Sequence, residues 1–226
     1  MVNVAETALS HMKVNEHDIT GKRMVKLNDR TIYNYESSNM NANNPNSCCE
    51  VIFQHTYAVN KDDWALVRIL VSFLEEPTFN TLRTKEQLGY IVRAGFDVQL
   101  EVLFITILVQ SSTKDADYLE HRINEFLSNS KAHWDPTEAE VETIKEAVIN
   151  RIKQKRTSLA AEAAFNWNEI TKEEFKFDSD LRKIEAIERV TKERLLEAMD
   201  LIFFKNPRRL NMKVHSHAHR DDQATR

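Results

Sequence analysis

The sequence predicts an α+β fold, a two-layer sandwich in which helices pack on one face of an antiparallel sheet. Three observations support this fold class. Apolar and polar residues alternate in short segments before residue 110, helical spacing dominates the long stretch that follows, and a last alternating segment closes the pattern. No linker rich in Pro, Gly or Ser divides residues 21–226, so we expect a single domain there. Residues 1–20 are expected to be a helical extension from a preceding domain.

The first predicted strands are short and rich in β-branched and aromatic residues. Residues 24–27 and 31–35 flank the turn-like residues 28–30, which favours a hairpin. The polar segment 37–47, with its asparagines and a proline, is typical of a surface loop. Alternation over residues 51–57 then predicts a third strand.

Two helices are predicted next. Asn60 has the side chain of an N-cap, and Pro77 is expected to end the helix that Asn60 begins. A second, short helix is predicted over residues 79–88, with Thr78 as its cap and Gly89 as the left-handed residue that closes it.

A central pair of antiparallel strands should follow those helices. Residues 90–98 and 103–109 are both strand-like, and the short connection near residues 99–101 leaves no room for a crossover.

The remaining sequence predicts a block of helices and a closing strand. Asp135 is expected to cap a helix, with Pro136 in its first turn. Thr191 is expected to cap the last helix before Pro207. The other predicted elements are helices over residues 158–171 and 178–189 and a strand over 210–217.

Composition argues against several classes of function. Lys and Arg number 31 against 35 Asp and Glu, a formal net charge of -4, without the concentrated positive surface that a nucleic-acid binder needs. The longest apolar run, residues 103–109, is too short to cross a bilayer. Three glycines are too few for a Gly-rich phosphate loop. We therefore expect neither nucleic acid nor a membrane among the partners.

The two cysteines, Cys48 and Cys49, are adjacent, which does not fit a secreted disulfide framework. Two ordinary thiols at the start of a strand in a reducing compartment are the favoured interpretation, and a vicinal disulfide or reactive pair is the alternative.

Histidines and carboxylates offer two segments for a metal, and neither has catalytic spacing. The motifs HExxH and HxxEH are both absent. The segment from His11 to His17 comes nearest to such a motif, but its first histidine lies two residues too far from the Glu-His pair at its end. A solvated helix end is therefore favoured. On a strand, His215, His217 and His219 would share one face, where adjacent pairs could chelate a metal. A polar strand end is the favoured interpretation, because no carboxylate is placed beside them by spacing.

The most informative segment is FNTLRTKEQLGYIV, residues 79–92. It resembles the LRTxEQLGY motif in the C-terminal half of the insulysin and pitrilysin peptidases, a family of zinc metallopeptidases. The resemblance extends more faintly from near Met24 to near Val214 and includes residues 165–170.

The resemblance implies a LuxS/MPP-like fold and a place for this chain as the fourth, C-terminal domain of an insulysin-like parent. It implies zinc in the parent's first domain and no metal or catalytic residue here. The implied partners are the parent's zinc-bearing N-terminal domains and peptide substrates, and a homo-oligomer of the parent is left open.

Arg83 and Tyr90 are the residues at which the motif places substrate binding. The resemblance implies that they reach the substrate backbone at the scissile bond, where a guanidinium and a phenol favour developing negative charge. Residues 94–100 depart from the family pattern, which reduces the basic lining expected there. From spacing alone, the favoured interpretation is a solvated helix residue for Arg83 and a half-buried strand residue for Tyr90.

The resemblance therefore favours a non-catalytic domain that closes the chamber of a peptide-degrading zinc metalloendopeptidase, with a cytoplasmic location. The alternative is a scaffold or partner-binding domain of a zinc-free superfamily member.

Overall fold

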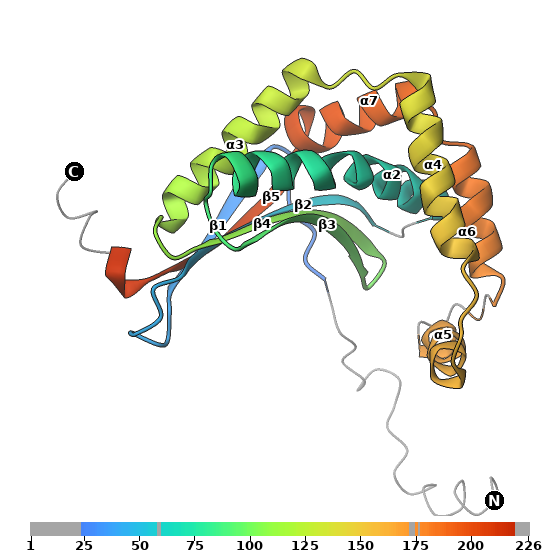
Figure 1. The fold of residues 1–226 in the computed structure, drawn as a ribbon, viewed down its shortest axis with the longest axis horizontal. Helices are drawn as coiled ribbons and strands as arrows, with labels where there is room; N and C mark the ends of the chain where they lie inside the picture. Colours follow the sequence, from blue (N-terminus) through green and yellow to red (C-terminus); the bar gives the residue numbers. More distant parts are fainter. Residues whose placement is uncertain (1–23, 58–59, 172–174, 176, 220–226) are drawn as a thin grey trace, which may run out of the picture.

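A five-stranded mixed sheet forms one layer of the computed structural model, which describes residues 24–57, 60–171, 175 and 177–219 (Figure 1). The sheet has the order β1-β5-β2-β4-β3. The helix expected over the first twenty residues and the segment from His11 to His17 lie outside the described residues. The strands are β1 (Thr31–Ser38), β2 (Ser47–Tyr57), β3 (Ile91–Gln99), β4 (Val102–Ser111) and β5 (Arg208–His215).

The predicted α+β sandwich is confirmed, with one difference in the direction of an edge strand. The pairs β2–β4, β3–β4 and β2–β5 are antiparallel, whereas β1 and β5 pair in parallel. The parallel pair arises because β5, after the whole helical block, inserts between β1 and β2 and runs opposite to β2.

The predicted hairpin at the start of the described chain is wrong. Residues 24–27 form no strand, and the side chain of Gln54 bonds their backbone instead. Its Oε1 accepts from Leu27 N–H at 2.9 Å and its Nε2 donates to Val25 O at 2.8 Å. The segment therefore lies along the face of the sheet, and the outer edge of β1 has no strand partner among the described residues.

The second layer consists of helices on one face of the sheet, joined by short turns (Figure 1). The helical elements of the described residues, not all of which belong to this layer, are α2 (Lys61–Thr78), the π-helix η3 (Phe79–Lys85), α3 (Ala116–His133), α4 (Glu138–Lys153), α5 (Leu159–Thr171), α6 (Ser179–Glu188), α7 (Lys192–Asp200), the π-helix η4 (Leu201–Lys205) and the 3-10 turn η5 (His217–His219).

Two of the four predicted caps, Asn60 and Thr191, start their helices. Asn60 Oδ1 accepts from Asp63 N–H at 2.8 Å, and Thr191 caps α7. The start of α4 differs, because Thr137 and Glu140 form a reciprocal capping box two residues after Asp135. Asp135 instead pairs with the ammonium of Lys192 at 2.7 Å.

The expected break at Pro77 is also wrong. Pro77 lies inside α2, and the chain continues into η3 without a new N-cap, since Thr78 has helical backbone angles and no capping bond. Proline cannot donate to the carbonyl one turn earlier, and a π-helix is one way a helix absorbs such a disruption.

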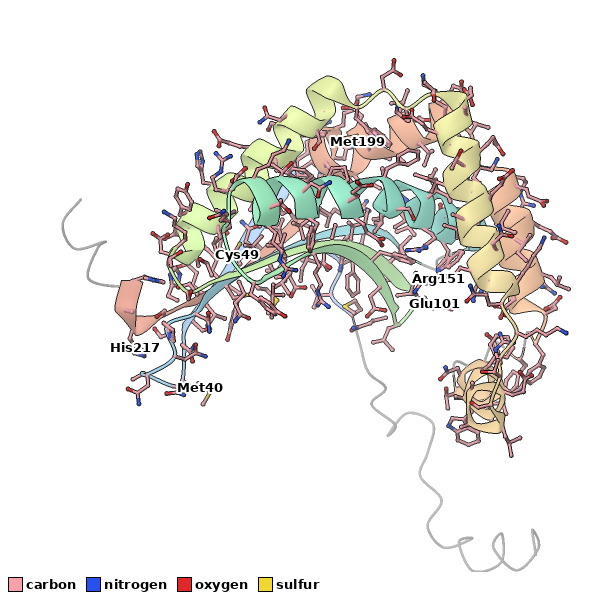
Figure 2. All side chains as sticks on the ribbon, viewed as in Figure 1. Met40, Cys49, Glu101, Arg151, Met199 and His217 are labelled. Atoms are coloured by element: carbon pink, nitrogen blue, oxygen red, sulfur yellow. The ribbon has the colours of Figure 1, made fainter. Side chains whose placement is uncertain are left out.

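The core fills the space between the layers. Four alternate residues of β4 are fully buried toward the helices, as period-two alternation predicts, and Phe53 meets Phe203 edge to face at 4.9 Å. Cys49 also belongs to this core (Figure 2). The buried β4 residues are Leu103, Ile105, Ile107 and Val109.

Helix α5 differs from the others because it stands away from the body on the side opposite the helical layer (Figure 1). Leu159 and Trp167 on this helix are 88% and 63% exposed. No helix within the described ranges is long and apolar enough to span a membrane.

Candidate substrate-binding site

The π-helix η3 and the turn after it position the motif side chains. The turn is anchored on α3 by Glu86, whose carboxylate accepts from Arg122 Nε at 2.7 Å and from Arg122 Nη2 at 2.9 Å. This bidentate pair raises the pKa of Arg122, and Leu88 is buried beneath it. The backbone from η3 to β3 is therefore held at two points.

Gly89 has a role other than the predicted left-handed cap. The positive φ in this turn belongs to Gln87, at 53°, and no described glycine has one. A Cβ added at Gly89 would lie 1.8 Å from the backbone oxygen of Gln110 in β4. Glycine is required because the two backbones approach too closely for any side chain.

Arg83 lies between two aromatic rings. Its Cζ is 4.6 Å from the ring centroid of Phe79 and 4.9 Å from that of Tyr90. Tyr90 is 83% exposed and Phe79 is 40% exposed, so the stack is open to solvent. The structure thus brings together the two predicted residues, and cation–π attraction holds the guanidinium in place.

Phe79 is a member of this cluster that the sequence analysis missed. It lies four residues before Arg83, a spacing that places two helical side chains on the same face. That spacing was the available signal. No hydrogen bond or ion pair joins the Arg83 guanidinium or the Tyr90 hydroxyl to another side chain in the part of the chain that the structure describes, so their donors are available to a ligand.

The three C-terminal histidines do not share a face. His215 ends β5, whereas His217 and His219 lie in η5. His217 Nε2 lies 3.0 Å from Asn39 O, and His219 Nδ1 lies 3.0 Å from Ser47 Oγ. These contacts replace the period-two arrangement that chelation required.

One group of possible metal ligands occurs among the described residues, and it already holds a cation. Oxygen or nitrogen atoms of Glu36, Asp117 and His215 lie within 4.8 Å of one another. The Lys213 ammonium lies 2.7 Å from a carboxylate oxygen of each acid, so a protein cation takes the place of a metal. The group does not fit zinc.

Cys49 is buried and Cys48 is half-buried, which agrees with the favoured interpretation of two ordinary thiols. Both are free, and burial raises the pKa of Cys48 to about 11 and of Cys49 to about 12. They stay protonated near neutral pH and are poor nucleophiles.

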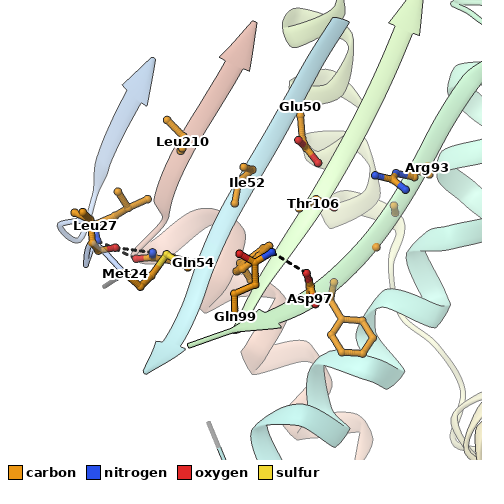
Figure 3. A pocket seen from close by; sticks show the side chains of 15 residues that line it. Met24, Leu27, Glu50, Ile52, Gln54, Arg93, Asp97, Gln99, Thr106 and Leu210 are labelled. Atoms are coloured by element: carbon orange, nitrogen blue, oxygen red, sulfur yellow. Dashed lines mark hydrogen bonds between the residues drawn. The ribbon is translucent and has the colours of Figure 1, made fainter. Parts of the chain in front are cut away.

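The open face of the sheet carries a hollow of about 780 Å³ (Figure 3). Its floor includes Ile52, Phe104 and Leu210, and the segment 24–27 forms one wall. Arg93 and Asp97 of β3 lie at the opposite wall.

Residues 69–167 match a family model described as PQQ synthase PqqF-like, C-terminal lobe domain 4. Human insulin-degrading enzyme is 32% identical over 195 residues, which make up 85% of this chain and 19% of that protein. The chain belongs to the pitrilysin and insulysin family. The A-factor-processing enzyme of Saccharomyces cerevisiae is 32% identical over 166 residues, 73% of this chain and 16% of that protein.

The chain spans about a fifth of the length of the insulysin relatives it matches. A crystal structure of pitrilysin superposes with a TM-score of 0.76 at 20% identity, covering 94% of this chain and 23% of that one. The fold is therefore that of a C-terminal domain in this family of peptidases.

Proposed function

We propose that this chain is the non-catalytic, substrate-holding domain of an insulysin-like zinc metalloendopeptidase that degrades peptides. The observation that carries the proposal is the stack of Phe79, Arg83 and Tyr90, which presents a guanidinium and a phenol to solvent with their donors available. Groups of this kind bind carbonyl oxygens and favour the negative charge that develops on a carbonyl during hydrolysis.

The rings limit the movement of Arg83 before substrate arrives. A long side chain loses rotamer freedom on binding, and a guanidinium already held between two rings loses less. Fixed donors stabilise a developing charge better than donors that must reorganise. Arg83 and Tyr90 would therefore position the scissile peptide while the domain closes the chamber.

The parent's zinc would be held by another domain, since the cluster of Glu36, Asp117 and His215 described above already binds the Lys213 ammonium. A cytoplasmic location belongs to the same proposal and is supported by two free thiols. Peptide substrates and the zinc-bearing domains are the proposed partners, and association of parent chains stays open.

A second candidate function is a partner-binding scaffold in a zinc-free superfamily member. The exposed apolar side chains of α5 favour it, because large exposed apolar surface is typical of protein interfaces. Under this alternative the Arg83 stack has no role in hydrolysis.

Kinetics of the full-length parent separate the two functions. We expect Tyr90→Phe, which keeps the ring and removes the hydroxyl, to lower kcat/KM for a fluorogenic peptide by roughly 10- to 1,000-fold with folding nearly unchanged. Arg83→Lys should lower kcat/KM by a similar factor, because lysine keeps the charge but lacks the planar guanidinium that binds two oxygens at once.

Tyr35→Phe and Arg194→Lys are matched controls at exposed positions outside the stack. Activities of both stack variants within about twofold of the wild type would exclude substrate holding by these residues.

A further inference from the structure

We propose that the outer edge of β3 binds an extended peptide, which adds to the sheet as a further strand beside Tyr90. The inference rests on the proposed function and gives the substrate a conformation and a surface. β3 is an edge strand in the sheet order, and it begins one residue after Tyr90. A peptide held at Tyr90 would therefore meet this edge next.

The register of the β3–β4 hairpin determines which backbone groups face outward. Gln99 pairs with Val102 across the two-residue turn Leu100–Glu101, where both residues have positive φ. In such a turn the flanking pair is hydrogen-bonded, and bonded pairs then alternate along the ladder. Ile91, Arg93, Gly95 and Asp97 thus bond β4, and the residues between them present N–H and C=O groups to the edge.

The end of the edge nearest the hairpin turn is closed by a side chain. Asp97 Oδ1 accepts from Val98 N–H at 2.8 Å, which agrees with an outward direction for that amide. The outward groups of Val92, Ala94 and Phe96 make no further backbone hydrogen bonds within the described part of the chain. The edge accordingly offers three consecutive pairing positions between Tyr90 and Asp97.

Gly95 leaves space on the open face at the middle of this edge. A Cβ there would meet only Thr106 Oγ1, at 3.8 Å, so packing does not require glycine, unlike at Gly89. Glycine weakens a strand and often marks a place where another chain approaches closely. A peptide residue beside Gly95 has room for a large side chain between Arg93 and Asp97 (Figure 3).

The helix face of the same edge has a second place for a side chain. A hollow of about 300 Å³ lies at Phe96, and its wall is formed by α2 and α4. Arg68 and Arg151 contribute positive charge there, and Arg151, on α4 (Figure 2), has no ion-pair partner among the described residues. Arg68 pairs with Glu75 at 3.2 Å. The remaining lining residues are Trp64, Val148 and Ile152.

This hollow favours a glutamate at the peptide position beside Phe96, since its methylene groups would contact apolar walls and its carboxylate the arginines. The two hollows lie on opposite faces of β3, as alternate side chains of an added strand require. The other edge strand, β1, lies at the far side of the sheet from β3 and so is not next to the Arg83 stack or these two hollows. The geometry therefore selects a peptide of extended conformation at β3.

The first test uses the chain itself and a synthetic peptide without proline, in which one glutamate is flanked by apolar residues. At saturating peptide we expect amide hydrogen exchange to slow by about tenfold or more at Val92, Ala94 and Phe96. Exchange at Arg93 and Gly95 should change little, because those amides already bond β4. Equal slowing at both sets, or slowing at neither, would overturn strand addition.

Two N-methylated versions of the same peptide provide a control that leaves the protein unchanged. One version carries N-methyl groups on the odd amides and the other on the even amides. Strand addition predicts that one version binds about tenfold or more weakly than the parent peptide and the other nearly normally. Equal affinities for the two versions would contradict the proposal.

Ala94→Pro in the chain is the matching protein variant. Its N–H points outward, so proline removes a peptide-binding donor without removing a bond to β4, a position at which edge strands tolerate proline. We expect about tenfold weaker peptide binding with an unchanged circular dichroism spectrum, and wild-type affinity of a folded variant would overturn the proposal. If the variant does not fold, the N-methylated peptides decide.

Failure of this inference is distinguishable from failure of the proposed function. Loss of parent activity in Tyr90→Phe and Arg83→Lys, combined with insensitivity to alternate N-methylation, would preserve substrate holding and exclude strand addition. Alternate sensitivity to N-methylation with full activity of both stack variants would give the reverse result.

Discussion

Arg83 and Arg209 both lie over aromatic rings, and their surroundings assign them opposite roles. Arg209 in β5 is 7% exposed, with its Cζ 5.5 Å from the Phe53 centroid. Its guanidinium donates to Asn211, Asn124 and Glu120 at 2.6, 2.7 and 3.2 Å. Arg83 has two rings and no such acceptors among the described side chains. A buried cation whose donors are bonded to protein acceptors stabilises the fold, whereas a solvent-exposed cation without such acceptors is available to a ligand.

The enclosed region extends beyond Arg209. Asn211 and Lys213 follow it at every second position of β5 and face α3, where Asp117 and Glu120 supply acceptors. Together these contacts place polar residues on the helix face of a central strand, where alternation alone predicts apolar ones. They hold β5 in register between β1 and β2.

The largest expected effect tests the two arginines directly. Arg209→Met should lower the free energy of unfolding by about 3–5 kcal/mol, because Asn211, Asn124 and Glu120 would all lose the guanidinium donor in a largely buried place. Arg83→Met should change it by less than about 1 kcal/mol. Urea unfolding followed by circular dichroism measures both, and equal losses would contradict the division into structural and available cations.

The two glycines extend the comparison from side chains to backbone. Gly89→Ala should cost about 1–3 kcal/mol, because the new Cβ would overlap the Gln110 carbonyl and backbone must shift. Gly95→Ala should stay within about 0.5 kcal/mol of the wild type or be slightly more stable. Thermal unfolding at one protein concentration provides the measurement, and a larger loss at Gly95 would be contrary to the geometry.

Alkaline pH should weaken the enclosed region more than the open site. Burial raises the pKa of Cys49 from 9.0 to about 12, so the folded state holds a proton that the unfolded chain releases. Stability from this group is complete below pH 9 and falls as pH rises from about 9 toward 12. Lys213 acts in the same direction at higher pH, since hydrogen bonds to Asp117 and Glu36, although opposed by burial, raise its pKa.

Urea unfolding at pH 8, 9.5 and 10.5 with reductant present measures this dependence. In Cys49→Ala the free energy of unfolding should fall less between pH 8 and pH 10.5 than in the wild type, although the variant is less stable at pH 8. An unchanged slope would show that the Cys49 thiol does not contribute.

The smallest expected effect concerns Phe79. Phe79→Leu keeps an apolar side chain and removes one ring from the stack, so stability should change by less than about 1 kcal/mol. In the parent, kcat/KM should fall about two- to fivefold, mainly through KM, because Arg83 is less well positioned. An effect as large as that of Tyr90→Phe would mean that Phe79 itself contacts the reacting peptide.

Local sequence was sufficient for much of this domain. The alternation of β3 and β4, the caps at Asn60 and Thr191, and the helical spacing of the later segments act over a few residues, and the structure confirms them. The motif of residues 79–92 likewise identified the family without any tertiary contact. Such features depend on backbone preferences and periodicity, which neighbouring residues determine.

Other features required the tertiary structure. Pro77 stays helical because α2 packs along the sheet, and Gly89 is required because β4 approaches it, so neither outcome depends on adjacent residues. Asp117 and Glu36 are far apart in sequence, and the fold brings both carboxylates to the Lys213 ammonium. This ammonium occupies the place where a metal ion would bind. The direction of β1 beside β5 is also long-range, because it depends on where β5 returns to the sheet after the helical block.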